Sequence, residues 1–208
     1  MIRNVILDWS GTVVDDLAPV VKATNLIFKD FGRPEMSLQE FREKFQLPFS
    51  KFYAEHLPEA TIEGIEPLYH RFFHSLQDEV TLLPGAREFL DFCQATGRRL
   101  FLLSTIRKDH FETQATRLDV LRYFEHPYVE IFDKREKIRE ILKIHALLPQ
   151  ETIFVGDMMH DIETARHGGI LGVAVQTGFD PINKLLMANP AVIVENLRAL
   201  QTLLSHEN

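Results

Sequence analysis

The sequence predicts an α/β fold in which a doubly wound parallel sheet is interrupted by an α-helical insertion. The first observation behind this prediction is a series of short, nearly continuous apolar runs that end in small or acidic residues. The second is that helical patterns separate most of these runs, and such alternation indicates parallel βαβ units. The third is the segment 15–82, where helical patterns occur and no β-rich run does.

Six apolar runs are the predicted strands. Strands that are buried on both faces are typically almost continuously apolar rather than alternating. The runs cover residues 4–8, 99–104, 129–132, 152–157, 171–175 and 191–194. Helical patterns between them cover residues 86–97, 109–121, 134–148 and 161–168. The order of these elements predicts a Rossmann-like sheet whose ligands bind at the carboxyl ends of the strands.

The inserted segment is predicted to be a small helical domain. Its helical patterns cover residues 17–31, 38–45, 50–56 and 62–77. The chain has 16 phenylalanines, and half of them fall between Phe28 and Phe73, so we expect most of these rings to form the core of the insertion. The predicted division is a core domain of residues 1–14 and 83–208 and a helical cap domain of residues 15–82.

Composition limits the partners of this chain. Its 208 residues include 23 basic and 30 acidic side chains and carry a net charge of −7, which argues against nucleic acid or an anionic membrane as the main partner. The single cysteine, Cys93, lies in an apolar run and excludes an internal disulfide. The first residues are unlike a signal peptide and no apolar stretch is long enough to span a bilayer, so we expect a cytoplasmic protein.

Acidic side chains follow two of the predicted strands directly. Asp8 ends the first run and precedes a turn that contains Gly11, which places its carboxylate among free backbone N–H groups. This arrangement suits an anion held over a nucleophile. A loop carboxylate that caps the next helix is the alternative interpretation of Asp8.

A second acidic pair, Asp157 and Asp161, lies at the end of the fourth run and the start of a helical pattern. Together with Asp8 it places three carboxylates at one sheet edge, where their repulsion requires a cation or raised pKa values. Oxygen ligands in a phosphate-type site favour Mg²⁺. Lys134 adds one positive charge, so that Mg²⁺ brings the formal sum to zero. Asp161 also fits the N-cap of a helix.

These segments together resemble the haloacid dehalogenase superfamily of aspartate-nucleophile hydrolases. Residues 8–15 resemble its first motif, residues 102–104 the second, Lys134 the third and residues 156–161 the fourth. The resemblance covers essentially the whole chain. It is nearest to the subfamily with a helical cap inserted after the first motif, to which phosphoglycolate phosphatase and β-phosphoglucomutase belong.

The resemblance implies a nucleophile and a metal site. Asp8 would attack phosphorus and form an aspartyl-phosphate. The backbone carbonyl of Ser10 and the carboxylate of Asp157 would hold Mg²⁺ beside Asp8, and Asp161 would support the site.

The resemblance also implies a phosphate-binding set. Ser104, Thr105 and Lys134 would hold the phosphoryl oxygens, and Lys134 would offset charge between the nucleophile and the substrate. Thr105 stands where the family often has Asn. Lys137 is an alternative to Lys134 for this role.

Ser10 is the main departure from the family pattern. Phosphatases and phosphomutases of this family have a second Asp two residues after the nucleophile, which protonates the leaving group and then activates water. A serine cannot replace it at neutral pH, and general acid–base catalysis contributes roughly 10² to 10⁴ in rate. Asp15, Asp16 and His56 are alternative sources of this catalysis, although an acid at residue 15 or 16 also fits the start of a helix.

Three functions therefore stay open. The first is a phosphatase of a small phosphorylated metabolite. The second resembles phosphonoacetaldehyde hydrolase, which has Asp-Trp-Ala-Gly-Thr in the first motif and uses a cap lysine as a Schiff base. Lys51 is the candidate for that lysine, and a solvated helix lysine is its alternative interpretation. The third is a phosphate-compound binder that has lost turnover. The sequence is compatible with a monomer or a homodimer.

Overall fold

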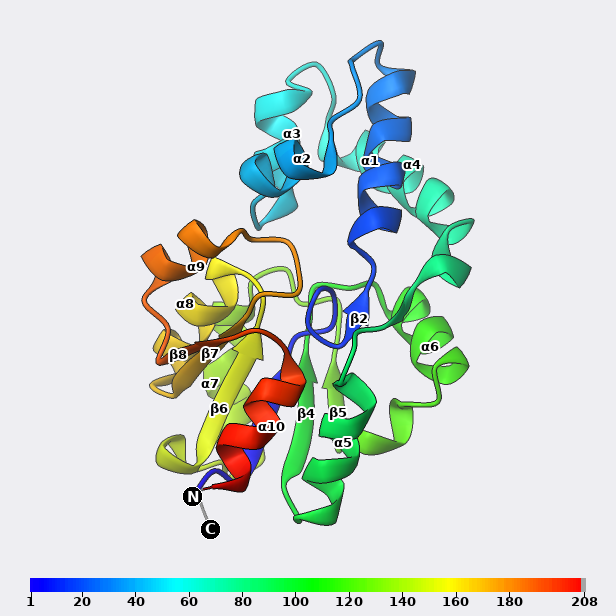
Figure 1. The fold of residues 1–208 in the computed structure, drawn as a ribbon. Coiled ribbons are helices and arrows are strands. Elements are labelled where there is room, and N and C mark those ends of the chain that lie inside the picture. Colours follow the sequence, from blue (N-terminus) through cyan, green and yellow to red (C-terminus); the bar gives the residue numbers. More distant parts are fainter. Residues whose placement is uncertain (207–208) are drawn as a thin grey trace.

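The computed structural model of the protein describes residues 1–206 and contains the predicted α/β sheet. All six strands of the main sheet are parallel, and Figure 1 shows their carboxyl ends pointing toward one group of helices. In spatial order they are β5 (His126–Tyr128), β4 (Arg99–Leu103), β1 (Asn4–Leu7), β6 (Thr152–Gly156), β7 (Leu171–Val175) and β8 (Val192–Val194).

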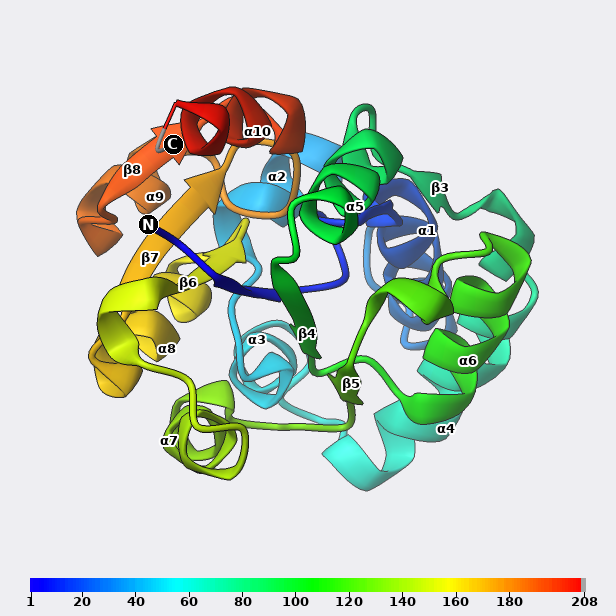
Figure 2. The ribbon, with the colours of Figure 1, turned by 90° about the horizontal axis from the view of Figure 1, so that it is seen from below.

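Helices cover both faces of this sheet. The helices of the core are α5 (Ala86–Ala95), α6 (Lys108–Arg117), α7 (Lys134–Ile144), α8 (Met159–Gly168), α9 (Ile182–Ala188) and α10 (Leu197–Ser205). Figure 2 shows α5 and α10 against one face and α7 and α8 against the other. The central strands are buried on both sides, as in Ile6, Phe101 and Phe154, which explains their continuous apolar sequence.

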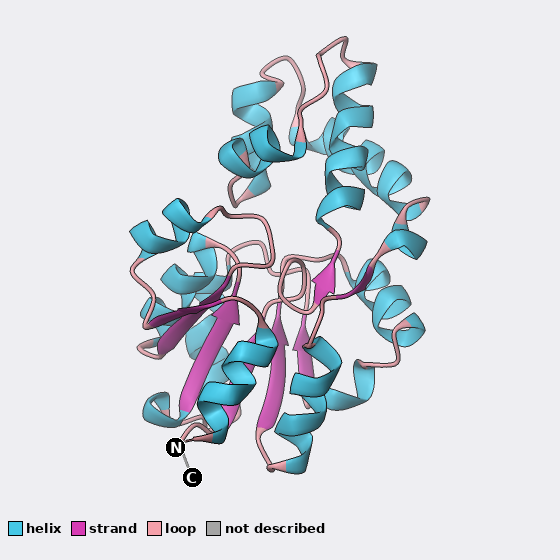
Figure 3. Cartoon of the chain, in the orientation of Figure 1, coloured by secondary structure: helices cyan, strands magenta, loops and turns pink. Residues whose placement is uncertain are grey.

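The segment between β1 and α5 forms four helices beyond the carboxyl edge of the sheet, visible as the upper group in Figure 3. They are α1 (Leu17–Asp30), α2 (Leu38–Lys44), α3 (Phe49–His56) and α4 (Ile62–His74). We call them the helical insert. Its two connections to the core pair as a short antiparallel ladder, β2 (Val14–Asp15) with β3 (Thr81–Leu82), at the predicted domain boundaries.

Phenylalanines form much of the interior of the helical insert, as the sequence predicts. Phe28, Phe41 and Phe52 are almost completely buried, and Phe52 contacts the other two, with ring centroids 5.6 Å from Phe41 and 6.1 Å from Phe28. Phe45 stacks on Phe41 at 4.8 Å. Cys93, which lies in an apolar run of the sequence, is buried in the core domain.

The strand predicted over residues 129–132 is wrong. The strand instead precedes this run, over His126–Tyr128, and its central residue is a proline that an edge strand accommodates because one side of it needs no ladder hydrogen bonds. Glu130 then adopts a positive φ of 59°, which ends the extended backbone. The apolar run becomes a loop, and Phe132 at its end is 66% exposed.

Two helices near the carboxyl terminus, α9 and α10, were not predicted from the sequence. Three short 3₁₀ helices, at Gln77–Glu79, Leu121–Tyr123 and Pro149–Glu151, complete the described elements. Within residues 1–206, no helix combines the length and the apolar character needed to cross a membrane.

Candidate active site

Asp8, Ser104 and Asp157 lie where three adjacent central strands end. β1 pairs with β4 on one side and with β6 on the other, so that Leu7 lies beside Leu102 and Val155. The backbone N–H of Asp8 continues the ladder by donating to the Val155 carbonyl at 2.9 Å. The sheet register therefore holds these polar side chains at one edge, beneath the helical insert.

Lys134 is the residue that joins the acids of this site. It is the first residue of α7, its side chain is completely buried, and its Nζ lies 2.8 Å from Asp8 Oδ2 and 2.8 Å from Asp161 Oδ1. These two carboxylates raise the pKa of Lys134 although burial acts against it, so the ammonium is charged. Lys137 instead pairs with Glu140 at 2.7 Å, so it does not share this position.

Asp157 is held by neutral donors. Its Oδ1 accepts from the Thr12 hydroxyl at 3.0 Å, and its Oδ2 accepts from the Phe179 backbone N–H at 2.7 Å. Glycines make room for it, because a Cβ on Gly11 would lie 2.4 Å from Asp157 Oδ2 and one on Gly178 only 2.0 Å from it. These contacts fix the carboxylate without a paired cation.

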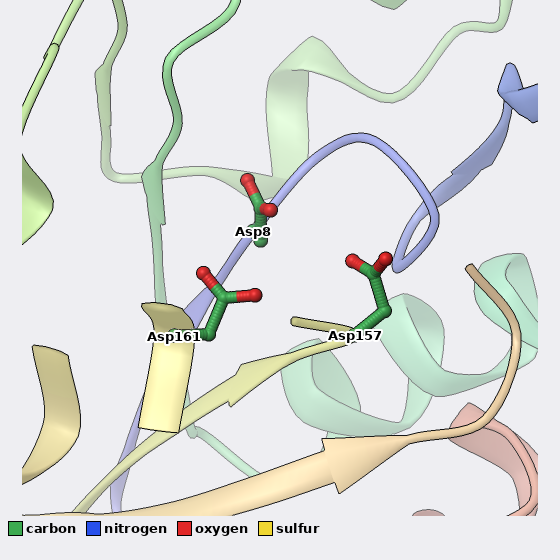
Figure 4. Close-up of side chains that lie close together, drawn as sticks. All are labelled: Asp8, Asp157 and Asp161. Atoms are coloured by element: carbon green, nitrogen blue, oxygen red, sulfur yellow. The ribbon is translucent and has the colours of Figure 1, made fainter. Parts of the chain in front are cut away.

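The three carboxylates converge. Oxygen atoms of Asp8, Asp157 and Asp161 lie within 4.8 Å of one another, and Figure 4 shows the side chains reaching toward a common space from the ends of β1 and β6 and the start of α8. All three residues are buried. Burial is the largest cause of the raised pKa values of Asp8 and Asp157, and the neighbouring acids raise them further.

This donor set fits a divalent cation. Three carboxylates and the Lys134 ammonium leave a formal charge of −2 in a buried space. Hard carboxylate oxygens with this charge are the environment that Mg²⁺ prefers. Asp161 is the least free of the three, since its Oδ2 accepts from the Met158 backbone N–H at 3.0 Å at the start of α8. The N-cap of α8 is Met158, so the N-cap interpretation of Asp161 is wrong: Asp161 is the third residue of the helix and caps its start from within while belonging to the cluster.

The predicted phosphate-binding residues lie beside this cluster. Ser104 is buried and Thr105 is half-buried, and both line a cavity that Asp8 and Ser10 also line. Lys134 contacts Asp8 but is not among the residues that line the cavity. Lys51 is exposed on α3 and is not among the residues that line the cavity.

Ser10 forms a hydrogen bond that the sequence analysis did not anticipate. Its hydroxyl donates to Asp16 Oδ2 at 2.6 Å. Asp16 is the N-cap residue of α1, as the sequence suggested, but its side chain makes no capping bond to the helix. Asp16 is 1% exposed, lines the cavity, and has a second oxygen, Oδ1, that is buried without a hydrogen-bond partner. Desolvation raises its pKa to about 7.

The other candidates for the missing acid lie elsewhere. Asp15 is exposed in β2, and His56 is not among the cavity-lining residues. One further buried acid was missed: Asp180 Oδ2 accepts from the Met159 backbone N–H at 2.7 Å at the start of α8. Neither Asp16 nor Asp180 belongs to a motif, so only the fold could bring them to the site.

Known proteins resemble this chain both in sequence and in fold. Residues 5–175 match the haloacid dehalogenase-like hydrolase family. The chain belongs to this family.

One relative is a phosphoglycolate phosphatase from Synechococcus elongatus, which is 25% identical over 93% of this chain and 92% of its own length. Among solved structures, a haloacid dehalogenase-like hydrolase from Streptococcus pneumoniae superimposes with a TM-score of 0.87 over 99% of both chains at 24% identity. A predicted phosphoglycolate phosphatase from Haemophilus somnus superimposes with a TM-score of 0.82 over 98% of both chains at 18% identity. The structural likeness confirms the haloacid dehalogenase-like fold of this chain.

Proposed function

We propose that this hydrolase is a Mg²⁺-dependent phosphatase of a small phosphorylated metabolite that works through an aspartyl-phosphate on Asp8. The observation that carries the proposal is the buried cluster of three carboxylates around Lys134, at the carboxyl edge of the sheet, from which Asp8 lines a cavity. Phosphoglycolate phosphatases among the relatives support a phosphate ester as the substrate.

Asp8 and Asp157 would hold Mg²⁺, with Asp161 and the Ser10 backbone carbonyl in support. The bound ion would offset negative charge on the phosphoryl group and orient it. Ser104, Thr105 and Lys134 would bind the remaining phosphoryl oxygens. The Lys134 ammonium also fixes the Asp8 carboxylate in one orientation, because it holds Oδ2 while the Trp9 backbone N–H donates to Oδ1 at 2.7 Å.

The chemistry is a pair of displacements at phosphorus. In the first, an Asp8 oxygen bonds to phosphorus while the bond from phosphorus to the leaving oxygen breaks. In the second, a water oxygen bonds to phosphorus while the bond from phosphorus to Asp8 breaks, which releases phosphate and regenerates the carboxylate. The leaving oxygen needs a proton in the first step, and the water must lose one in the second.

We assign these proton transfers to Asp16, acting through the Ser10 hydroxyl. The assignment rests on their 2.6 Å hydrogen bond, on the burial of Asp16 and on its place in the cavity wall. The Ser10 hydroxyl would pass its proton to the leaving oxygen and receive the proton of Asp16. Reversing this relay in the second step returns the proton of water to Asp16.

The two alternative functions receive less support. A phosphonatase would need Lys51 at the reacting carbon, yet that lysine is exposed and away from the cavity lining. Trp9, which suggested the phosphonatase resemblance, is buried in the core and donates from Nε1 to Gln114 Oε1 at 2.7 Å. A binder without turnover would not need a buried acid bonded to Ser10.

The test is turnover of a generic phosphate monoester by the purified protein with and without Mg²⁺. The proposal expects release of phosphate that requires Mg²⁺ and is lost in Asp8→Asn. A panel that includes phosphonoacetaldehyde separates the alternatives. An adduct on Lys51 that borohydride traps would support the phosphonatase, and absence of all turnover with retained phosphate-ester binding would support the binder.

A further inference from the structure

The cavity above Asp8 is large and mainly hydrophobic. Its volume is about 840 Å³, within the range of roughly 300–1,000 Å³ that is typical of sites for ring-containing small molecules. Active-site residues form its floor. Its walls are aromatic rings from the helical insert, among them Phe45, Phe49 and Tyr69, and from core loops, among them Phe132 and Phe179.

The cavity has this volume while the helical insert is in contact with the core. On one side, Arg42 of α2 donates to the carbonyls of Phe179 and Asp180 at 3.3 and 3.2 Å. In return, Lys184 of α9 donates to the carbonyls of Arg42 and Phe45, both at 2.9 Å. The large cavity is therefore not produced by an insert that has swung away from the core on this side.

The opposite side of the insert also contacts the core. His70 Nδ1 on α4 lies 3.1 Å from His110 Nε2 on α6, and their rings stack with centroids 5.2 Å apart. Phe49 at the start of α3 lies near Phe132, with ring centroids 6.4 Å apart. Contacts on both sides leave the aromatic walls facing the space above Asp8.

The cavity offers no free positive charge to a leaving group. Among its lining residues, the only lysine or arginine is Arg107, whose guanidinium already pairs with both oxygens of Asp109 at 2.7 and 2.6 Å. The lining also includes Glu66 and Glu130, which disfavour a second anion. Burial lowers the pKa of His70 and lowers that of His110 to about 4, so these imidazoles are neutral near pH 7.

On the basis of the proposed phosphatase function, we propose that the substrate is a phosphate monoester whose leaving group is uncharged and carries an aromatic or other apolar ring. The aromatic walls would bury the ring, which removes apolar surface from water on both partners. The hydroxyls of Tyr69 and Thr24 and the neutral imidazole of His70 would supply hydrogen bonds to uncharged polar groups. A short leaving group with a carboxylate, such as glycolate, would leave the cavity mostly unfilled and its own charge unpaired.

Four phosphate esters of primary alcohols separate the effect of leaving-group size from that of leaving-group charge. They are phosphoglycolate, 2-hydroxyethyl phosphate, benzyl phosphate and 4-carboxybenzyl phosphate. We expect kcat/KM for benzyl phosphate to exceed that for each of the other three esters by about ten-fold or more. A hydrophobic pocket typically discriminates by about ten-fold or more against a substrate that lacks an apolar group. A kcat/KM for phosphoglycolate equal to or above that for benzyl phosphate would overturn the inference while leaving the phosphatase function intact.

Binding of the same four esters to the Asp8→Asn variant, measured by calorimetry, tests the inference without turnover. Benzyl phosphate should bind most tightly, and tighter binding of phosphoglycolate would contradict the proposal. If the wild-type protein hydrolyses none of the four esters, the proposed function fails, and the binding order still decides which leaving group the cavity accepts.

Phe132 offers a matched pair of variants, because its exposed side chain can be replaced without disturbing the core. Phe132→Arg should raise the ratio of kcat/KM for 4-carboxybenzyl phosphate to that for benzyl phosphate by about ten-fold relative to Phe132→Gln, since it supplies the missing cation. Equal ratios in the two variants would show that charge in the cavity wall does not select the leaving group.

Discussion

The Ser10 hydroxyl donates a 2.6 Å hydrogen bond to Asp16 Oδ2, which joins the turn after the nucleophile to the first helix of the insert. Ser10 lies two residues after Asp8, where the family resemblance implies a catalytic acid, and Asp16 supplies a buried carboxyl six residues farther along the chain. The serine at one position and the buried acid beside it are thus parts of one arrangement. We propose that this pair performs the proton transfers.

Replacing Asp16 with asparagine tests this pair. Asp16→Asn keeps the shape of the side chain and removes its proton, so kcat/KM, which reports the first displacement, should fall by roughly 10² to 10⁴ for an ester with an alkyl leaving group. The fall should be much smaller for 4-nitrophenyl phosphate, whose leaving group needs little protonation. Steady-state kinetics on the two esters measures the difference.

The exposed neighbour Asp15 provides the control for Asp16. Asp15→Asn should leave kcat for both esters within about two-fold of wild type, since surface changes of this kind have small effects. Equal losses of kcat/KM on both esters in Asp16→Asn would argue for a purely structural role of Asp16. Ser10→Ala should share the leaving-group dependence if the hydroxyl carries the proton.

Lys134 should be essential for stability as well as for catalysis. In Lys134→Met, Asp8 and Asp161 lose the buried ammonium that lies 2.8 Å from each. Breaking a buried ion pair on one side typically costs 3–5 kcal/mol, so we expect a loss of about 3–5 kcal/mol in the free energy of unfolding without Mg²⁺. Urea denaturation measures it. Lys137→Met, which removes an ion pair with Glu140 and an ammonium lying over the Tyr128 ring, should change stability by less than about 1 kcal/mol.

Mg²⁺ should stabilise the protein through the carboxylate cluster. A ligand that binds only the folded state adds about 2.7 kcal/mol at a hundred-fold excess over its Kd, so the melting temperature should rise with Mg²⁺ concentration. Asp157→Asn should remove most of this rise and should melt above the wild type in metal-free buffer, because it relieves buried repulsion. A full Mg²⁺ response in this variant would place the ion elsewhere.

His110 should make stability depend on pH. Its pKa is lowered from 6.5 to about 4, chiefly by desolvation, with Arg107, His70 and His74 acting in the same direction and Asp109 opposing them. The unfolded chain therefore binds an extra proton between these values, and stability falls as the pH drops from 6.5 toward 4. The contribution is up to about 3 kcal/mol.

Comparison of wild type with His110→Gln isolates this contribution. Urea denaturation near pH 7.5 and near pH 5 should show a smaller loss of unfolding free energy in the variant, since glutamine does not titrate over this range. Identical losses in both proteins would show that His110 protonates normally in the folded state.

The sheet was predictable because its signal is local and strong. Strands such as β1 and β6 are continuous apolar runs that end in an acid, and parallel strands place their carboxyl ends together, so the meeting of Asp8 and Asp157 followed from sequence alone. The strand near residue 130 was misplaced because the same apolar composition also serves a loop that contributes Phe132 to the cavity.

The pairing of Ser10 with Asp16 was not predictable, for a physical reason. An acid before a helix is most often an N-cap, and only the tight turn of Ser10–Val14 and the pairing of β2 with β3 bring Asp16 back toward Ser10. The substrate cavity depends equally on tertiary contacts. Its walls combine rings from the insert with rings from two distant core loops.

The covalent intermediate is the most direct test of the account. Wild-type protein with Mg²⁺ and a turning-over ester is quenched in acid, and the phosphoryl group is located by peptide mass spectrometry. The account predicts an acid-stable phosphoryl group on Asp8 that is absent in Asp8→Asn. With 4-nitrophenyl phosphate as the ester, this group should accumulate further in Asp16→Asn, because its second step lacks the base while its first step needs little protonation. A phosphoryl group on another residue, or turnover that persists in Asp8→Asn, would contradict it.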